Sequence, residues 1–227
     1  MALAIACVAL IGQVPQENHA EETNLATLMA GFKFIRSEQV VLGAISLDLF
    51  AVLLGGAVAL LPIYARDILE VGPWGLGLLR AGPGIGAIFM ALWLSKFPIK
   101  DKAGVILFLF VAGFGLCTLV FGLSKSVPLS IAALAVMGAC DMVSVYVRET
   151  LLQLWTPDAV RGRVNAVNRV FIGASNELGE FRAGVVAAAI GAVSAVAIGG
   201  AGTMAVAFLW SRWFPELRNA RKLDGRS

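Results

Sequence analysis

Six ionisable side chains lie inside, or directly at the end of, apolar stretches that are long enough to cross a lipid bilayer: Asp48, Asp141, Arg148, Glu177, Glu180 and Arg182. An ionisable group at bilayer depth costs roughly 2.5–3.5 kcal/mol on insertion scales, so it usually pairs with another group or serves a function. We expect these six residues to be candidates for a substrate or proton pathway. The alternative is an internal network of ion pairs and hydrogen bonds that only fixes helix packing.

Helical geometry places several of these residues on one face. At about 100° per residue, Gly173, Glu177, Glu180 and Gly184 fall within about 60° of one another, whereas Arg182 points nearly opposite. Small residues above and below two carboxylates favour a close helix contact with a polar pocket. Two carboxylates one turn apart in a low dielectric also favour proton uptake by one of them, which a proton-coupled step requires.

The segment Gly82-Pro83-Gly84-Ile85-Gly86 is a candidate gating or helix-kink element. Proline removes a backbone hydrogen bond inside a helix, and glycines permit bending or the close approach of a neighbour. The segment therefore predicts a kink in its helix. Such a kink can act as a gate, or it can be a static packing device.

The chain has six long apolar stretches: 40–64, 74–94, 104–123, 127–147, 164–190 and 192–214. The last two follow one another without a charged break, and we expect them to divide near Gly191 because roughly 20 residues suffice to cross the hydrocarbon. Apolar residues make up 59% of the chain and charged residues 15%, against about 25% charged in soluble domains. The sequence predicts an all-α membrane protein with a bundle of six transmembrane helices.

Ionisable residues are shared unevenly among the six stretches. The first, fourth and fifth carry them well inside, and in the fourth Asp141, Ser144 and Arg148 form one stripe about two turns long. The third carries none, and the sixth carries only Arg212, near its end. We therefore predict that the first, fourth and fifth stretches line a protein or water-filled interior, while the third and sixth face lipid.

Lysines and arginines are sorted between alternate gaps. The gaps after the first, third and fifth stretches, with their flanks, hold only Arg66, Arg80 and Lys125. The remaining gaps and ends hold many more: Lys33, Arg36, Lys96, Lys100, Lys102, Arg161, Arg163, Arg169, Arg212, Arg218, Arg221, Lys222 and Arg226. Short cationic loops stay cytoplasmic, so both ends of the bundle, and the carboxy terminus, are predicted to be cytoplasmic.

The chain outside the bundle (40–214) divides into three parts. Residues 1–14 are apolar but reach only about 21 Å as a helix, so we interpret them as the remnant of a preceding transmembrane helix; the alternative is a signal-like or interfacial segment. Residues 15–39 are predicted to be a cytoplasmic linker with an amphipathic helix over 24–39, whose apolar face comprises Leu25, Leu28, Met29, Phe32 and Ile35. Residues 215–227 are predicted to be a cytoplasmic tail.

Several function classes find no support in the sequence. It contains no phosphate-cradling loop, metal-ligand cluster or nucleophile–base arrangement, so we expect no catalytic residues, no metal and no cofactor, and an intramembrane enzyme is disfavoured. The formal net charge of +3 is sorted along the chain rather than massed in a patch, so no nucleic-acid partner is expected.

Five strings carry a resemblance to a known family: SLDLFAVLLGG (46–56), LPIYARDIL (61–69), GLGLLRA (75–81), TPDAVRGR (156–163) and GASNELGEF (173–181). They resemble the seventh helix, the eighth helix, the loop after the tenth helix and the eleventh helix of the enterobactin-exporter-like subgroup of the major facilitator superfamily. The resemblance implies half of a major facilitator fold, helices seven to twelve. It places Arg161, Gly162 and Arg163 in a cytoplasmic loop motif.

The resemblance also implies a function. It points to the carboxy-terminal half of a secondary active transporter, a proton-coupled exporter of small molecules that works by alternating access. Helices seven, eight, ten and eleven of such transporters line the cavity, which agrees with the distribution of ionisable residues. The implied location is the bacterial cytoplasmic (inner) membrane. The implied partners are the lipid bilayer, a small-molecule substrate and the missing amino-terminal six-helix half.

One alternative function stays open. The chain could be a non-transporting six-helix membrane protein that acts as a partner subunit or as a homodimer. Transport by the isolated chain would favour a functional homodimer, whereas an in-frame six-span coding segment directly upstream would favour one half of a longer protein.

Overall fold

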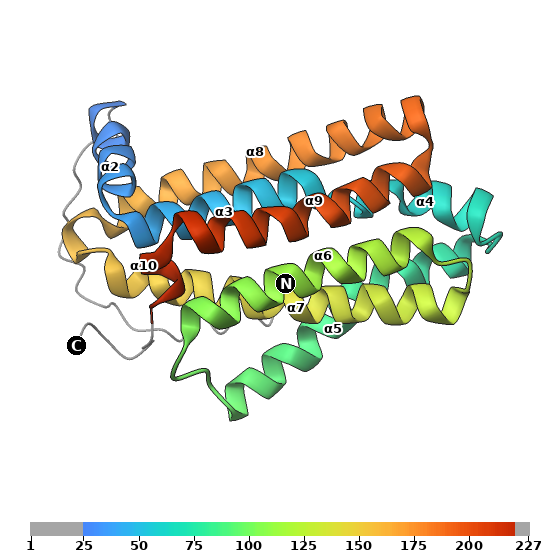
Figure 1. The fold of residues 1–227 in the computed structure, drawn as a ribbon, viewed down its shortest axis with the longest axis horizontal. Helices are drawn as coiled ribbons and strands as arrows, with labels where there is room; N and C mark the ends of the chain where they lie inside the picture. Colours follow the sequence, from blue (N-terminus) through green and yellow to red (C-terminus); the bar gives the residue numbers. More distant parts are fainter. Residues whose placement is uncertain (1–24, 221–227) are drawn as a thin grey trace, which may run out of the picture.

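The chain forms a bundle of six long helices within residues 25–220, the part that the computed structural model describes. These helices are α3 (Gln39–Gly55), α5 (Pro73–Lys96), α6 (Ala103–Leu123), α7 (Val127–Trp155), α8 (Asp158–Ile190) and α9 (Ala192–Trp213). They run along the long axis of the molecule, whereas α2 (Leu25–Ser37) stands across one end (Figure 1). The described residues contain no strand, so the expected all-α six-helix bundle is confirmed.

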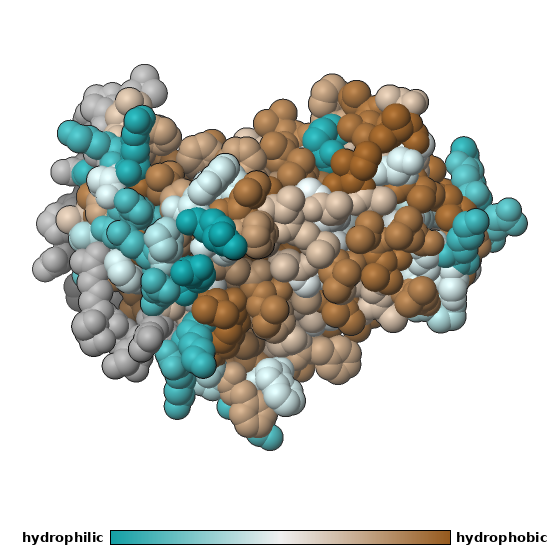
Figure 2. Space-filling view, in the orientation of Figure 1, coloured by the Kyte–Doolittle hydropathy of each residue, from teal (hydrophilic) through white to brown (hydrophobic). Residues whose placement is uncertain are grey.

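Five segments of the described part are long and apolar enough to cross a membrane: Gln39–Ile68, Pro73–Lys96, Ala103–Leu123, Val127–Trp155 and Ala192–Trp213. The sixth long helix, α8, has 33 residues but is too charged to join them, because Arg169, Glu177, Glu180 and Arg182 lie along it. It nevertheless packs beside α3 and α9. Figure 2 shows apolar side chains across the middle of the molecule and polar ones gathered mainly at its ends. The chain is a multi-pass membrane protein.

One end of the bundle collects the basic residues, and we call it the basic end. It holds α2, α10 (Pro215–Arg218) and the loops that follow α5 and α7 (Figure 1). The predicted sorting of lysines and arginines therefore corresponds to two opposite ends of the molecule. Which end faces the cytoplasm stays a prediction.

Segments flanking the bundle also pack at the basic end. The predicted amphipathic helix is present as α2, but only part of its expected face is covered: Ile35 is buried, whereas Met29 and Phe32 are 64% and 43% exposed. Leu217 of α10 is fully buried, and the Gly104 N–H donates to the Ala220 carbonyl at 3.0 Å. Residues 215–220 of the expected tail are thus packed against the bundle. Residues 1–14, residues 15–24 of the predicted linker, and residues 221–227 lie outside the described part.

The first apolar stretch is interrupted, although the sequence was expected to form one continuous span over 40–64. α3 ends at Gly55, and the chain continues through a 3₁₀ turn η1 (Val58–Leu60), a short α4 (Leu61–Ile63) and a π-helical turn η2 (Tyr64–Ile68). Two adjacent glycines, Gly55 and Gly56, lower the cost of leaving the helix, and Pro62 lacks the N–H that a continuing helix needs. We call residues 55–57 the α3 break.

Small residues and a few buried hydrogen bonds hold α3 and α6 against α9. A Cβ at Gly115 of α6 would lie 2.8 Å from the Gly200 carbonyl oxygen, so these two helix backbones are in close contact. The Thr203 hydroxyl of α9 donates to the Ala51 carbonyl at 3.1 Å, and the Trp210 indole N–H donates to the Ser46 hydroxyl at 2.9 Å. The first contact joins α6 to α9, and the two hydrogen bonds join α9 to α3.

Candidate functional site

A cavity of about 310 Å³ lies between the α3 break and the middle parts of α5, α7 and α8. Its apolar wall includes Val52, Val58, Pro83, Phe114 and Met137. Its polar lining consists of Asp141 from α7, Asn176 and Glu180 from α8, and the backbone of the α3 break. We call this space the main cavity. A concave, mostly apolar site with a few polar groups is the usual form of a small-molecule site.

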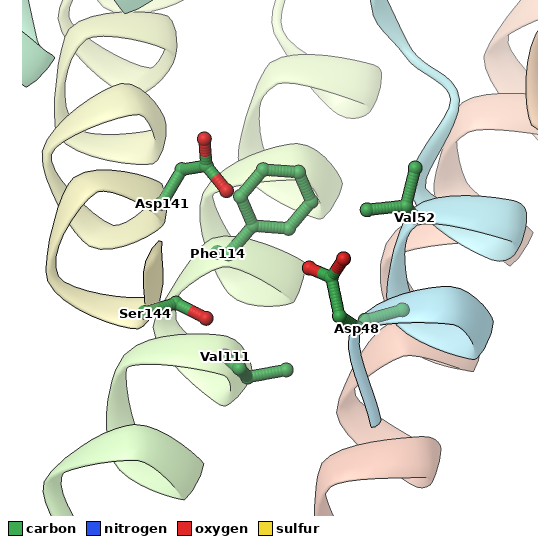
Figure 3. A pocket seen from close by; sticks show the side chains of 7 residues that line it. Asp48, Val52, Val111, Phe114, Asp141 and Ser144 are labelled. Atoms are coloured by element: carbon green, nitrogen blue, oxygen red, sulfur yellow. The ribbon is translucent and has the colours of Figure 1, made fainter. Parts of the chain in front are cut away.

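A second, much smaller cavity of about 20 Å³ adjoins Asp48 and Asp141. Figure 3 shows the side chains of Asp48 from α3 and Asp141 from α7 directed toward the same space, with Phe114 of α6 between them and Ser144 below. Asp141 and Phe114 line both cavities. The two aspartates, which are 93 positions apart in the sequence, therefore line the same small cavity beside the main cavity.

The Arg148 guanidinium of α7 forms an ion pair with the Asp48 carboxylate of α3. The two side chains are only 4% and 11% exposed. Both charged groups are removed from water, which costs free energy. The attraction between them offsets this desolvation penalty, which an unpaired buried charge would bear in full. Arg148 belongs to the predicted Asp141–Arg148 stripe, yet its direct partner is on another helix.

A further polar contact lies nearer the basic end than the Asp48–Arg148 ion pair does. The amide nitrogen of Asn168 on α8 donates to the Glu149 carboxylate on α7 at 3.2 Å, and Asn168 is buried. Together with the Asp48–Arg148 ion pair, it joins α3, α7 and α8 by polar contacts between the main cavity and the basic end. Neither Glu149 nor Asn168 was among the predicted site residues, because each lies in a mixed polar segment with no distinctive spacing.

Arg182 of α8 contacts the last turn of α3, next to the α3 break, instead of another ionisable residue. Its guanidinium donates to the carbonyl of Leu53 at 2.8 Å and to that of Leu54 at 2.5 Å. These two carbonyls belong to the last turn of α3, where the helix offers them no amide partner. The structure gives Arg182 the role of a helix cap, and its place in a substrate or proton pathway stays a prediction.

The predicted stripe on α8 is only partly at the site. Both glutamates are exposed in this bundle, but Glu180 lines the main cavity, whereas Glu177 is not among the lining residues. The expected close contact through Gly173 and Gly184 is wrong within the described part, since a Cβ at either position would meet nothing within 4 Å. Gly179 makes the contact instead: its Cβ would lie 2.9 Å from the Val52 carbonyl oxygen. Glycine spacing alone did not reveal which face of α8 meets α3.

Pro83 lies inside α5, which the structure describes as one helix from Pro73 to Lys96. Gly82 and Gly86 are buried against α7, and a Cβ at Gly86 would collide with the Ala135 carbonyl oxygen. Gly84 faces open space. These contacts give Gly82 and Gly86 a packing role, and the gating role of the segment stays a prediction.

Arg161, Gly162 and Arg163, which were predicted to form a cytoplasmic loop motif, lie instead in the first turns of α8 at the basic end, directly after the short link (156–157) from α7. Arg161 donates to the carbonyls of Gln153 and Thr156, at 3.2 and 3.3 Å, and forms an ion pair with Asp158 at 2.5 Å. Cations near a helix carboxy terminus stabilise it, so Arg161 caps α7. Gly162 is exposed with open space around it, and Arg163 lies beside Gly31 of α2.

The helices that line the site agree with the expectation in most respects. α3, α7 and α8 all contribute, as does α5 through Pro83. α6 was expected to face lipid only, but its Val111 and Phe114 reach the cavities. Apolar residues of this kind carry no sequence signal that distinguishes a cavity wall from a lipid-facing surface. No cluster of metal-ligating side chains occurs in the described part of the chain.

Comparisons with known proteins identify the family. The major facilitator family described as "Transmembrane secretion effector" matches residues 1–225. The chain is 27% identical over 209 residues to the enterobactin exporter EntS of Escherichia coli strain K12, and equally to that of Escherichia coli O9:H4 strain HS. Each match covers 92% of this chain and 50% of the relative, so the chain spans about half the length of these relatives. The chain belongs to the transmembrane secretion effector family of the major facilitator superfamily, and its six-helix bundle is half of that fold.

Proposed function

We propose that this chain is the carboxy-terminal half of a proton-coupled exporter of small molecules that works by alternating access. The observation that carries the proposal is the position of Asp141, which lines both the main cavity and the small cavity beside the Asp48–Arg148 ion pair. A group in this position is open to substrate on one side and to a buried charge pair on the other. Transport by this family and the exporter relatives support the same proposal.

The charge balance of Asp48, Asp141 and Arg148 supports proton coupling. Asp48 neutralises Arg148, which leaves Asp141 as the second carboxylate beside the same space. Asp48, Asp141 and Arg148 together carry a net negative charge, and proton uptake by either aspartate makes the three residues neutral. Protonation of Asp48 also removes the negative partner of Arg148, so it weakens the contact between α3 and α7. A proton can thereby change how two cavity-lining helices meet, which is what alternating access requires.

The proposal includes the missing partner half and the membrane. The main cavity has walls from one six-helix bundle, and an amino-terminal bundle would supply the rest. We place the basic end on the cytoplasmic side of a bacterial inner membrane, since short cationic loops stay there. The relatives are named for enterobactin, and export of a small molecule by this chain is part of the proposal.

Reconstitution in lipid vesicles tests the proposal. The chain is produced alone and together with the amino-terminal half of an EntS relative, and enterobactin movement is measured with and without an imposed pH gradient. We expect enterobactin to move only when both halves are present and a pH gradient is imposed. In Asp141→Asn, the rate of gradient-driven movement should fall by at least about tenfold. Gradient-independent movement in that variant would confirm coupling through Asp141. Equal gradient-driven movement with and without the Asp141 carboxylate would refute proton coupling through Asp141. Transport by the chain alone would favour a homodimer.

A further inference from the structure

The charges that line the main cavity are of one sign. Among its lining residues, the ionisable side chains are Asp141 and Glu180, from facing helices α7 and α8. Asn176 adds a neutral amide next to Glu180. Arg80 lies on α5 near this region, but it is exposed and is not among the lining residues.

Both arginines nearest the cavity are already occupied. Arg148 forms the ion pair with Asp48, and Arg182 donates to the carbonyls of Leu53 and Leu54. Neither guanidinium is among the groups that line the main cavity, and each already contacts α3.

The rest of the lining is apolar and includes one aromatic ring. Val52, Val58, Pro83 and Met137 contribute apolar surface, and Phe114 contributes a ring that lies close to Asp141 (Figure 3). The face of an aromatic ring attracts a cation, and a carboxylate attracts it further. Apolar walls that contain carboxylates and an aromatic ring match a ligand that is bulky, apolar and positively charged.

We infer that the main cavity binds lipophilic organic cations, with Asp141 and Glu180 as the carboxylates that recognise the positive charge. This inference rests on the proposed transport function for its biological meaning, but it makes a separate statement about charge selectivity. An anion of the same shape would face two carboxylates and no free cationic side chain among the lining residues, so the cavity would reject it.

Two probes of the same shape and opposite charge test the inference: tetraphenylphosphonium and tetraphenylborate. Saturable binding of each is measured by equilibrium dialysis with the purified chain in lipid nanodiscs, and protein-free nanodiscs correct for partition into lipid. We expect saturable binding of the cation and none of the anion. Glu180→Gln and Asp141→Asn should each weaken cation binding by about tenfold, which corresponds to about 1.4 kcal/mol.

Glu177→Gln is the matched control, because Glu177 lies one turn from Glu180 on α8 but does not line the cavity. It should leave binding of the cation unchanged, and circular dichroism should confirm that all variants keep their helical content. Anion binding equal to cation binding, no saturable cation binding, or an equal loss in Glu177→Gln would each overturn the inference.

The same vesicles that test transport separate the two proposals. Gradient-driven export of enterobactin without any competition by tetraphenylphosphonium would retain the transport function and overturn the cation site. Carboxylate-dependent cation binding without movement in the two-half assembly would retain the cation site and overturn the transport function.

Discussion

Arg148 of α7 forms a buried ion pair with Asp48 of α3, although the two residues are 100 positions apart. The pair lies between the main cavity and the Glu149–Asn168 contact, so it belongs to a polar layer that joins three cavity-lining helices. A buried charge that loses its partner is strongly destabilising, by about 3–5 kcal/mol. The stability of α3 against α7 therefore depends on both members of the pair.

Asp48→Asn should lower the free energy of unfolding by about 3–5 kcal/mol, because it leaves the Arg148 charge buried and unpaired. Unfolding in denaturing detergent, followed by circular dichroism, measures the change. The double variant Asp48→Asn/Arg148→Gln should recover a large part of the loss. The exposed pair Arg66–Asp67 supplies the control: Asp67→Asn should leave stability unchanged. A single variant as stable as the unmodified chain would contradict the structural role of the pair.

Arg182→Met should loosen the α3 break while keeping a side chain of similar length. The carbonyls of Leu53 and Leu54 would lose their donor in a largely apolar setting, which costs roughly 1–3 kcal/mol. Hydrogen exchange read by mass spectrometry should show faster exchange in the segment after Gly55. Arg212→Met, at the basic end of α9, serves as the comparison and should not change that segment. Unchanged exchange in Arg182→Met would show that the break is held by other contacts.

Gly86→Ala and Gly84→Ala should have opposite effects although they are two residues apart on α5. At Gly86 the added Cβ meets the Ala135 carbonyl oxygen, so α5 must move away from α7 and thermal stability should fall. At Gly84 the Cβ enters open space, and alanine should be neutral or stabilise the helix by about 0.5–1 kcal/mol. Melting temperatures in one detergent compare the two. If both alanines are tolerated equally, the close α5–α7 contact is not present in the membrane.

Phe114→Ala should open the small cavity to the main cavity, since the ring lines both. A cysteine at Ser144 reports access, after Cys7, Cys117 and Cys140 have been replaced by serine. Ser144→Cys should react slowly with a water-soluble thiol reagent when Phe114 is present, and at least about tenfold faster in Phe114→Ala. Val111→Ala, on the same helix and in the small cavity only, should change the rate less.

The site was predicted from the sequence in part. Asp48, Asp141 and Glu180 were recognised because an ionisable residue in an apolar stretch is conspicuous. Phe114 and Val111 were not, since an apolar residue in an apolar helix gives no indication of whether it faces a cavity or lipid. The α3 break was also missed, although the adjacent glycines Gly55 and Gly56 were a local signal for it.

The sequence by itself determined the membrane class, the number of long helices and the separation of basic residues to one end. These follow from hydropathy, helix length and charge along one chain, which need no knowledge of neighbours. Only the tertiary structure decided that Arg148 pairs with Asp48, that Arg182 caps α3 and that Gly179 contacts that helix. Helical periodicity describes how residues are arranged around one axis, whereas the face that meets a given neighbour depends on the packing of all six helices together.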